Sequence, residues 1–153
     1  MSATERLKNL GIILPQPAAA IAAYVPFVRT SNLVFISGQL PLLDGKVSQT
    51  GLLGDSVSIE RGKEAARICA INLLAQLQAA AGSLDKVKRV VRLGGFIAST
   101  PEFTDHAKAM NGASELMEAV FGEAGRHART TIGVASLPLG AAIEVEGLFE
   151  IME

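Results

Sequence analysis

The chain has 153 residues, which fits one domain of ordinary size, and we expect a single domain over 1–153. With 14 basic and 15 acidic residues the net charge is −1, which argues against a protein that mainly binds the nucleic-acid backbone. The single cysteine, Cys69, excludes an intramolecular disulfide framework, and the lack of a CxxC motif or of clustered His and Cys argues against a structural zinc site.

The composition is apolar for a small domain, since 49% of the residues are hydrophobic and 19% are charged. We therefore expect some apolar surface to be buried between subunits; a tightly packed, Ala-rich monomer is the alternative. No apolar run approaches the ~20 residues that span a bilayer. The opening "MSATERLKNLGIILPQP" has too short an apolar run for a secretory signal, so we expect a cytoplasmic protein without a membrane partner.

The first half of the chain predicts two strands and a long helix. Strands are expected over 25–30 and 33–37, around a Ser-Asn turn, and the Gly/Ser/Asp-rich stretch 44–58 is expected to be a loop. Apolar residues at helical spacing predict a helix over 59–81, with Ser58 as its N-cap and Gly82 after its last residue. Cys69 lies beside the apolar stripe and is expected to be a small core residue.

The second half predicts a strand over 87–97, a helix over 104–121 and two further strands over 128–135 and 141–151. Gly112 inside the second helix costs about 1 kcal/mol against Ala, so close packing or a ligand is expected to need the room. The order β-β-α-β-α-β-β predicts an α+β fold, a mixed sheet with two helices on one face. The other face would then need a partner.

The last two strands carry the charges that could form a site. "LPLG" at 137–140 suits a β-turn, so we expect a hairpin that aligns the apolar faces of the two strands. That alignment puts Arg129 on the same face as Glu144 and Glu146, with either Thr131 or Arg129 opposite Glu146. One interpretation is a solvated surface ion pair worth about 0–1 kcal/mol. The other is an Arg that binds a ligand carboxylate through two parallel hydrogen bonds, in an interface where charges need partners.

Three other basic residues lie near these elements. Arg126 is expected in a basic surface turn, and His106 is expected at the surface. His127 is either a surface residue or a proton carrier on the Arg129 face.

Five short segments stand out along the chain: "AAYVPFV" (22–28), "VFISGQLP" (34–41), "MN" (110–111), "ART" (128–130) and "LPLGAAIEVE" (137–146). Taken in this order they resemble the RidA/YjgF family, also called the Rid or L-PSP endoribonuclease family, and most of all a slightly longer subgroup of it. The resemblance covers nearly the whole chain. It implies a chorismate-mutase-like α+β fold and a homotrimer with a central barrel and three clefts between subunits.

The resemblance also implies an activity, the hydrolysis of reactive 2-imino or enamine acids to 2-oxo acids and ammonia, with no metal or organic cofactor. Arg129 is then expected to hold the substrate carboxylate and Glu144 to position or activate water. Tyr24, Ser37, Gly38 and Asn111 are expected to line the cleft. Two positions depart from the common pattern: Thr131 replaces a Cys, although its hydroxyl can still hold water, and His127 replaces a Pro.

Two other functions stay open from the sequence. One is a non-catalytic trimer that senses a small carboxylate metabolite. The other is an RNA-cleaving protein, against which the near-neutral charge and the single tyrosine argue.

Overall fold

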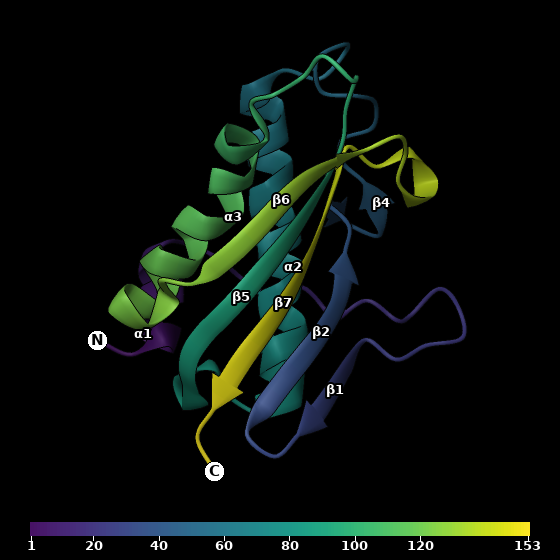
Figure 1. The fold of residues 1–153 in the computed structure, drawn as a ribbon. Helices are drawn as coiled ribbons and strands as arrows, with labels where there is room; N and C mark the ends of the chain where they lie inside the picture. Colours follow the sequence, from purple (N-terminus) through teal and green to yellow (C-terminus); the bar gives the residue numbers. More distant parts are fainter.

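A five-stranded mixed sheet with the strand order β1-β2-β7-β5-β6 forms the body of the molecule (Figure 1). The computed structural model describes residues 1–153. Neighbouring strands are antiparallel except for β5 and β6, which are parallel. The strands are β1 (Phe27–Thr30), β2 (Leu33–Gln39), β5 (Val87–Ala98), β6 (Ala128–Val134) and β7 (Ile143–Ile151), and a separate two-stranded pair is formed by β3 (Leu42–Leu43) and β4 (Lys46–Val47).

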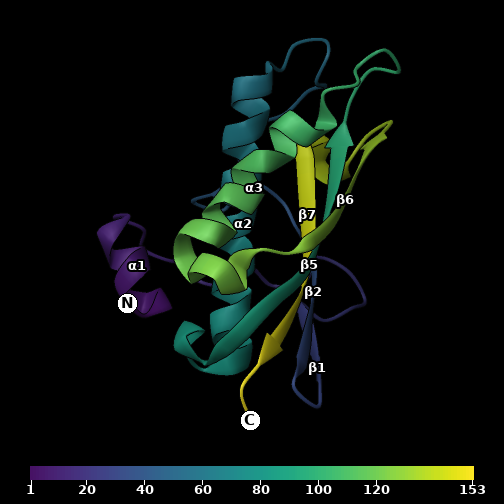
Figure 2. The ribbon, with the colours of Figure 1, turned by 60° about the vertical axis from the view of Figure 1, so that its left-hand side comes forward.

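Two long helices, α2 (Ile59–Ala81) and α3 (His106–Phe121), pack on one face of the sheet (Figure 2). The limits of α2 follow the expected signals, because the Ser58 hydroxyl accepts a hydrogen bond from the Arg61 amide at 3.2 Å and Gly82 takes the left-handed conformation at φ 81°. The expected order of the main strands and helices is confirmed, but the short pair β3–β4 is an addition, and β4 lies inside the stretch 44–58 that was expected to be a loop. No helix of the chain has the length and apolar character needed to cross a lipid bilayer.

A short helix, α1 (Ala3–Asn9), is an addition to the expected elements. Ser2 and Glu5 form a capping box at its start, which satisfies two backbone amides. Only Leu7 of this helix is buried, so it offers no apolar stripe from which it could be predicted. Three short 3₁₀ turns complete the chain: η1 (Leu84–Lys86), η2 (Gly122–Gly125) and η3 (Pro138–Gly140).

Close packing between α2 and α3 explains Gly112. A Cβ atom added at Gly112 would overlap the backbone carbonyl oxygen of Lys63 in α2. The missing side chain therefore lets the two helices approach, and of the two expected reasons the structure supports packing rather than a ligand.

We expect Gly112→Ala to lower the free energy of unfolding by about 2 kcal/mol, because a backbone carbonyl cannot move aside as a flexible side chain does. The steric cost of the new methyl group therefore exceeds the ~1 kcal/mol by which Ala would stabilise the helix through its higher helix propensity. Urea unfolding measures the change. Gly62→Ala is the matched control, since its new methyl group would meet the end of the Leu53 side chain, which can rotate. A Gly112→Ala protein more stable than the wild type would contradict this account.

The predicted hairpin of the last two strands is wrong. Strand β6 pairs with β5, and β7 lies between β2 and β5 (Figure 1). The segment between them is drawn away from β6 by the loop before α2: the Ala142 amide donates to the Gln49 carbonyl at 3.0 Å, and the Gly51 amide donates to the Gly140 carbonyl at 3.2 Å. The central position also gives β7 backbone partners on both sides, which suits its fully buried inner face.

This topology also reverses the predicted placement of Arg129 relative to the carboxylates. Leu93 of β5 lies opposite both Arg129 and Gly147, and its side chain is buried in the core under the helices. Residues opposite one another point to the same face, so Arg129 is on the face covered by the helices. Gly94 lies opposite both Thr130 and Glu146, so the row that holds Glu146 and Glu144 is on the open face. Within one copy of the chain, the arginine and the carboxylates are on opposite sides of the sheet.

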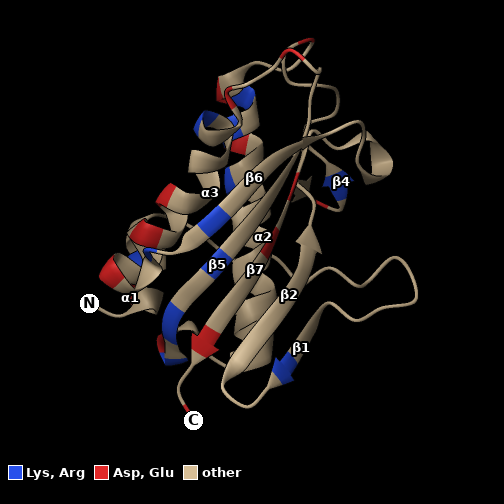
Figure 3. Cartoon of the chain, viewed as in Figure 1, with Lys and Arg blue, Asp and Glu red and all other residues tan.

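The open face has no helix over it and exposes several large apolar side chains. Val28, Phe35 and Ile132 keep 52%, 45% and 47% of their surface exposed there, although they are large hydrophobic residues. The charged residues on this side belong to β5 and β7, where basic residues on β5 lie next to acidic residues on β7, whereas β2 has no charged residue (Figure 3). Such a surface is typical of a buried interface between subunits.

Candidate functional site

The first group of candidate residues surrounds Arg129 on β6. Its guanidinium lies against one face of α3, where Ala107, Asn111 and Ser114 follow one another at helical spacing. Nη1 donates to the Asn111 side-chain oxygen at 2.8 Å and to the Ser114 hydroxyl at 3.1 Å. Nη2 donates to the Ala107 carbonyl oxygen at 3.1 Å. These three bonds fix the plane of the guanidinium.

All three acceptors of Arg129 are neutral, and no carboxylate lies within ion-pair distance of it. A guanidinium has five N–H donors. Nε–H and one N–H of Nη2 therefore remain without an acceptor. A half-buried cation that is held rigidly and lacks a counter-charge is suited to bind an anion, and two free N–H groups match a carboxylate.

Thr131 and Gly133 continue the same row along β6. The Thr131 hydroxyl oxygen is buried and has no hydrogen-bond partner. Gly133 leaves room for His106 and Ser99, since an added Cβ would lie 2.7 Å from both the His106 Nε2 and the Ser99 Oγ atoms. His106, expected at the surface, is half-buried between Gly133 and the edge of the Phe103 ring. The first turn of α3 faces β6. The sequence predicts where the helix starts but not which element its first turn packs against, so the position of His106 could not be predicted.

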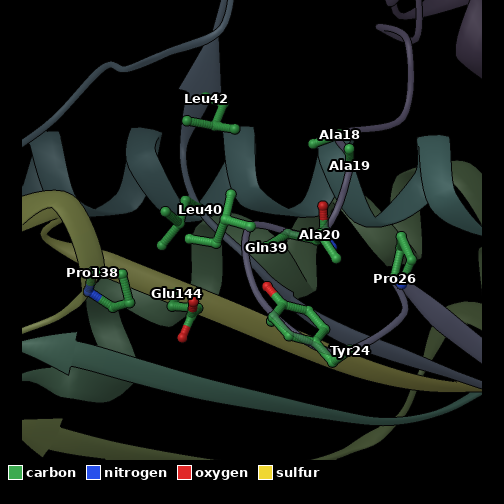
Figure 4. A pocket seen from close by; sticks show the side chains of 12 residues that line it. Ala18, Ala19, Ala20, Tyr24, Pro26, Gln39, Leu40, Leu42, Pro138 and Glu144 are labelled. Atoms are coloured by element: carbon green, nitrogen blue, oxygen red, sulfur yellow. The ribbon is translucent and has the colours of Figure 1, made fainter.

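The second group lines a small pocket beside β2 and the start of β7 (Figure 4). Glu144 at the start of β7 lies beside Gly38 of β2, where an added Cβ would be 2.8 Å from the Glu144 Cδ atom. The absence of a side chain at Gly38 therefore makes space for the carboxyl group. Tyr24 lines the same pocket. The full lining is Ala18, Ala19, Ala20, Ile21, Tyr24, Pro26, Gly38, Gln39, Leu40, Leu42, Pro138 and Glu144.

Glu144 is the carboxylate of β7 that has no partner. Glu146 lies 3.8 Å from Arg92 and Glu150 lies 2.9 Å from Lys88, whereas Glu144 makes no ion pair or hydrogen bond. Burial raises the pKa of the Glu144 carboxyl, and the negative charge of Glu146 raises it further. A carboxyl whose pKa is shifted toward neutrality is suited to accept and return a proton.

We expect Glu144→Gln to stabilise the fold at about pH 7, by less than about 1 kcal/mol because half of the side chain is in contact with water. The pKa of Glu144 is higher in the folded than in the unfolded protein. At pH values below the unfolded-state pKa the carboxyl is therefore protonated in both states, and it does not lower the free energy of unfolding. The cost develops as the pH rises from the unfolded pKa through the folded one. Thermal unfolding should therefore show a gain at neutral pH that vanishes below about pH 4. A gain that persists in acid would contradict the assignment, and Glu102→Gln on the surface is the control.

Ser37 lies next to this pocket and has a different contact from the one expected. Its hydroxyl donates to the Val25 carbonyl oxygen at 2.8 Å, and its amide donates to the Pro26 carbonyl oxygen at 2.9 Å. Both bonds tie β2 to the segment that carries Tyr24. The structure thus gives Ser37 a role in holding that segment.

The structure brings Arg129, Asn111 and Thr131 together in one group, and Tyr24, Gly38 and Glu144 in another, but it does not join the two groups in one copy of the chain. Sequence reasoning missed Ser114, although its spacing from Asn111 places both on one helix face. Cys69 is fully buried, as expected, and burial raises the pKa of its thiol well above the usual value. No cluster of three or more His, Cys, Asp or Glu side chains could hold a metal ion.

The comparisons with known proteins agree with this fold. A family model described as "YjgF/chorismate mutase-like, putative endoribonuclease" matches residues 4–151. Protein TCP17 of Trypanosoma cruzi is 49% identical over 146 residues, which cover 95% of this chain and 91% of that protein.

Two crystal structures are also similar along almost the whole chain. Protein Atu1372 of Agrobacterium tumefaciens, a protein of unknown function, is 48% identical with a TM-score of 0.90, covering 98% of this chain and 92% of that one. A Shewanella oneidensis protein described as a putative endoribonuclease is 35% identical with a TM-score of 0.96, covering 99% of this chain and 100% of that one. These similarities confirm the predicted α+β, chorismate-mutase-like fold.

Proposed function

Because the chain belongs to the YjgF/chorismate-mutase-like family, we propose that it hydrolyses small 2-imino acids and their enamine tautomers to 2-oxo acids and ammonia. The observation that carries this proposal is the pair of unmatched charges. Arg129 is a fixed cation without an anionic partner, and Glu144 is a carboxylate without a basic one. A substrate that has a carboxylate and an electrophilic carbon can use both.

The two charges would meet in a cleft between copies of the chain. Within one copy they are on opposite faces of the sheet, so one site needs Arg129 from one protomer and Glu144 from its partner. The apolar open face gives the copies a surface on which to associate. A homotrimer, which the family resemblance implies, would close this arrangement into a ring with three equal sites.

The reaction needs little from the protein. In the protonated imine R–C(=NH₂⁺)–COO⁻ the carbon is already electrophilic, and Arg129 would orient it through the carboxylate. Water attacks the carbon while Glu144 takes one of its protons and returns it to the nitrogen. The C–N bond of the resulting carbinolamine then breaks as the hydroxyl proton passes to Glu144 and from there to the departing ammonia. The balance is one imine and one water consumed, one 2-oxo acid and one ammonium ion formed. The unpartnered Thr131 hydroxyl could hold the water or the nitrogen, and Asn111 would keep Arg129 in place.

The test is ammonia release from 2-iminopropanoate and 2-iminobutanoate, generated in the cuvette by a dehydratase acting on Ser or Thr. These imines also hydrolyse unaided, so the measured quantity is the acceleration over buffer as protein is added. We expect a rate that rises in proportion to protein concentration. A rate that stays at the buffer value, with a folded protein and a saturating imine supply, would contradict the proposal.

A second function uses the same cation without turnover. Arg129 has N–H donors free for any small carboxylate, so the chain could bind a 2-oxo acid as a sensor. A ligand at 100 times its dissociation constant should stabilise the fold by about 2.7 kcal/mol. Stabilisation by 2-oxobutanoate without ammonia release would favour this second function.

RNA cleavage, suggested by the description of the family, has less support in this chain. Its net charge is −1, and Tyr24 is its only tyrosine. A phosphate-led binding mode would make RNA affinity fall steeply with salt. RNA affinity that is absent, or that does not change with salt, would agree with the imine proposal.

A further inference from the structure

His127 precedes β6 and lies two residues before Arg129, on the same side of the strand. Its Nε2 atom is 2.9 Å from the Ser114 hydroxyl oxygen, and its Nδ1 atom is 2.6 Å from the Gly125 carbonyl oxygen. Ser114 in turn accepts a hydrogen bond from Arg129 Nη1 at 3.1 Å. His127 therefore contacts the guanidinium through one intervening side chain.

The direction of these hydrogen bonds follows from the groups themselves. A carbonyl oxygen only accepts, so the Nδ1 atom of His127 must be the protonated nitrogen. In the neutral ring Nε2 is then an acceptor, and the Ser114 hydroxyl must donate to it. The Ser114 oxygen keeps its lone pairs for Arg129 Nη1. Each donor points to the next acceptor, from Arg129 through Ser114 and His127 to Gly125, and such chains polarise and strengthen their bonds.

A bond from the Ser114 hydroxyl to the His127 ring matters because a free hydroxyl rotates. With the hydroxyl hydrogen held by His127, the lone pairs of Ser114 stay directed at Arg129. Without His127 the hydrogen could point toward the guanidinium, and Nη1 would keep only its bond to Asn111.

We propose that His127 and Ser114 are positioning residues, which set the orientation in which Arg129 receives a carboxylate. The inference rests on the proposed function in taking Arg129 as the group that binds the ligand. In this arrangement both nitrogens of His127 contact groups of the protein, and the contact to Ser114 leads to Arg129, so we assign His127 a positioning role. The sequence left two interpretations of His127, a surface residue or a proton carrier, and the positioning of Arg129 is different from both.

The experiment compares four variants with the wild type: His127→Leu, His127→Gln, Ser114→Ala and the double variant with Leu and Ala. The amide oxygen of Gln can replace the Nε2 acceptor, while Leu removes it at a similar size. Three quantities are measured: the Kd for 2-oxobutanoate, kcat and KM for 2-iminobutanoate, and the ¹⁵N–¹H signals of the Arg129 guanidinium in the free protein. Thermal unfolding verifies that every variant is folded.

We expect His127→Leu to raise Kd and KM about tenfold with kcat nearly unchanged, since it removes binding made equally in the ground and transition states. His127→Gln should restore both to within about threefold. The Kd and KM of the double variant should be no higher than those of the single variant that binds less tightly, because His127 acts through Ser114. In the free protein, His127→Leu should broaden or average the Arg129 guanidinium signals that are resolved in the wild type.

Equal Kd values for the Leu and Gln variants, or additive effects in the double variant, would overturn the positioning role. The guanidinium signals separate this outcome from failure of the proposed function, since they need no ligand. Mobile guanidinium signals in His127→Leu together with no ammonia release from the wild type would support positioning and reject the reaction. Unchanged signals together with wild-type ammonia release would reject positioning and keep the reaction. If Leu destabilises the fold, the comparison of Ser114→Ala with Ser114→Thr, which restores the hydroxyl, decides the same question.

Discussion

Arg129→Ala is expected to abolish ammonia release from 2-imino acids, lowering kcat/KM by about a thousandfold. Removing one partner of a sheltered charge pair costs about 4 kcal/mol, which corresponds to that factor. The loss should be large because none of the three groups that contact the guanidinium carries a positive charge, so none of them can replace it in binding the carboxylate. Steady-state kinetics with 2-iminobutanoate measures the change.

Arg129→Lys and Arg126→Ala make this prediction specific. Lys keeps the charge but loses the planar pair of donors, so we expect an intermediate loss. Arg126 lies three residues earlier and pairs with Glu118 at 3.3 Å and Glu123 at 3.9 Å on the surface, so its removal should leave kcat/KM unchanged. Wild-type rates in Arg129→Ala would show that the carboxylate is bound elsewhere.

Mixing two inactive variants should restore activity. If each site takes Arg129 from one protomer and Glu144 from its neighbour, a mixed oligomer of Arg129→Ala and Glu144→Gln contains some sites in which both residues are native. Random assortment in a closed ring makes about one site in four native, so co-expressed chains should show about a quarter of the wild-type activity per site. Each variant alone should be inactive.

The control for this mixture is a chain that has both substitutions. When it is combined with Arg129→Ala, no site contains a native Arg129, and activity should stay at background. Background activity in the first mixture, with mass spectrometry showing that mixed oligomers formed, would mean that each chain builds its own site. The two groups would then have to meet by a rearrangement within one protomer.

Local signals in the sequence predicted the two long helices well. Ser58 and Gly82 set the ends of α2 through a hydroxyl cap and a left-handed residue, both of which depend on neighbours in the chain. Gly112 indicated that either close packing or a ligand needed the room, because a glycine inside a helix needs a specific explanation, and the structure shows that packing does. Helix α1 was missed because its capping box is not accompanied by an apolar stripe.

Pairing between distant segments could not be derived from local signals. The turn residues of "LPLG" predicted a hairpin, but two hydrogen bonds with the loop at 49–51 direct the chain elsewhere: the Ala142 amide donates to this loop, and the Gly140 carbonyl oxygen accepts from it. The error in pairing placed Arg129 and Glu144 on one face. Arg129 and Glu144 were first noted from the strand pattern, but their expected roles and the other candidate residues came from the family resemblance. The resemblance does not depend on knowing the face, so it is not affected by the error in the geometric argument.

The position of β7 has a consequence for how the protein is made. This strand follows every other strand of the sheet in the chain, yet it lies in the middle of the sheet. Until its residues leave the ribosome, the β1–β2 ribbon and the β5–α3–β6 unit have no direct strand contact with each other, and each presents an unpaired edge. The nascent polypeptide therefore stays open to aggregation or chaperone capture until almost all of these residues have been synthesised, and folding is completed by the segment that also carries Glu144.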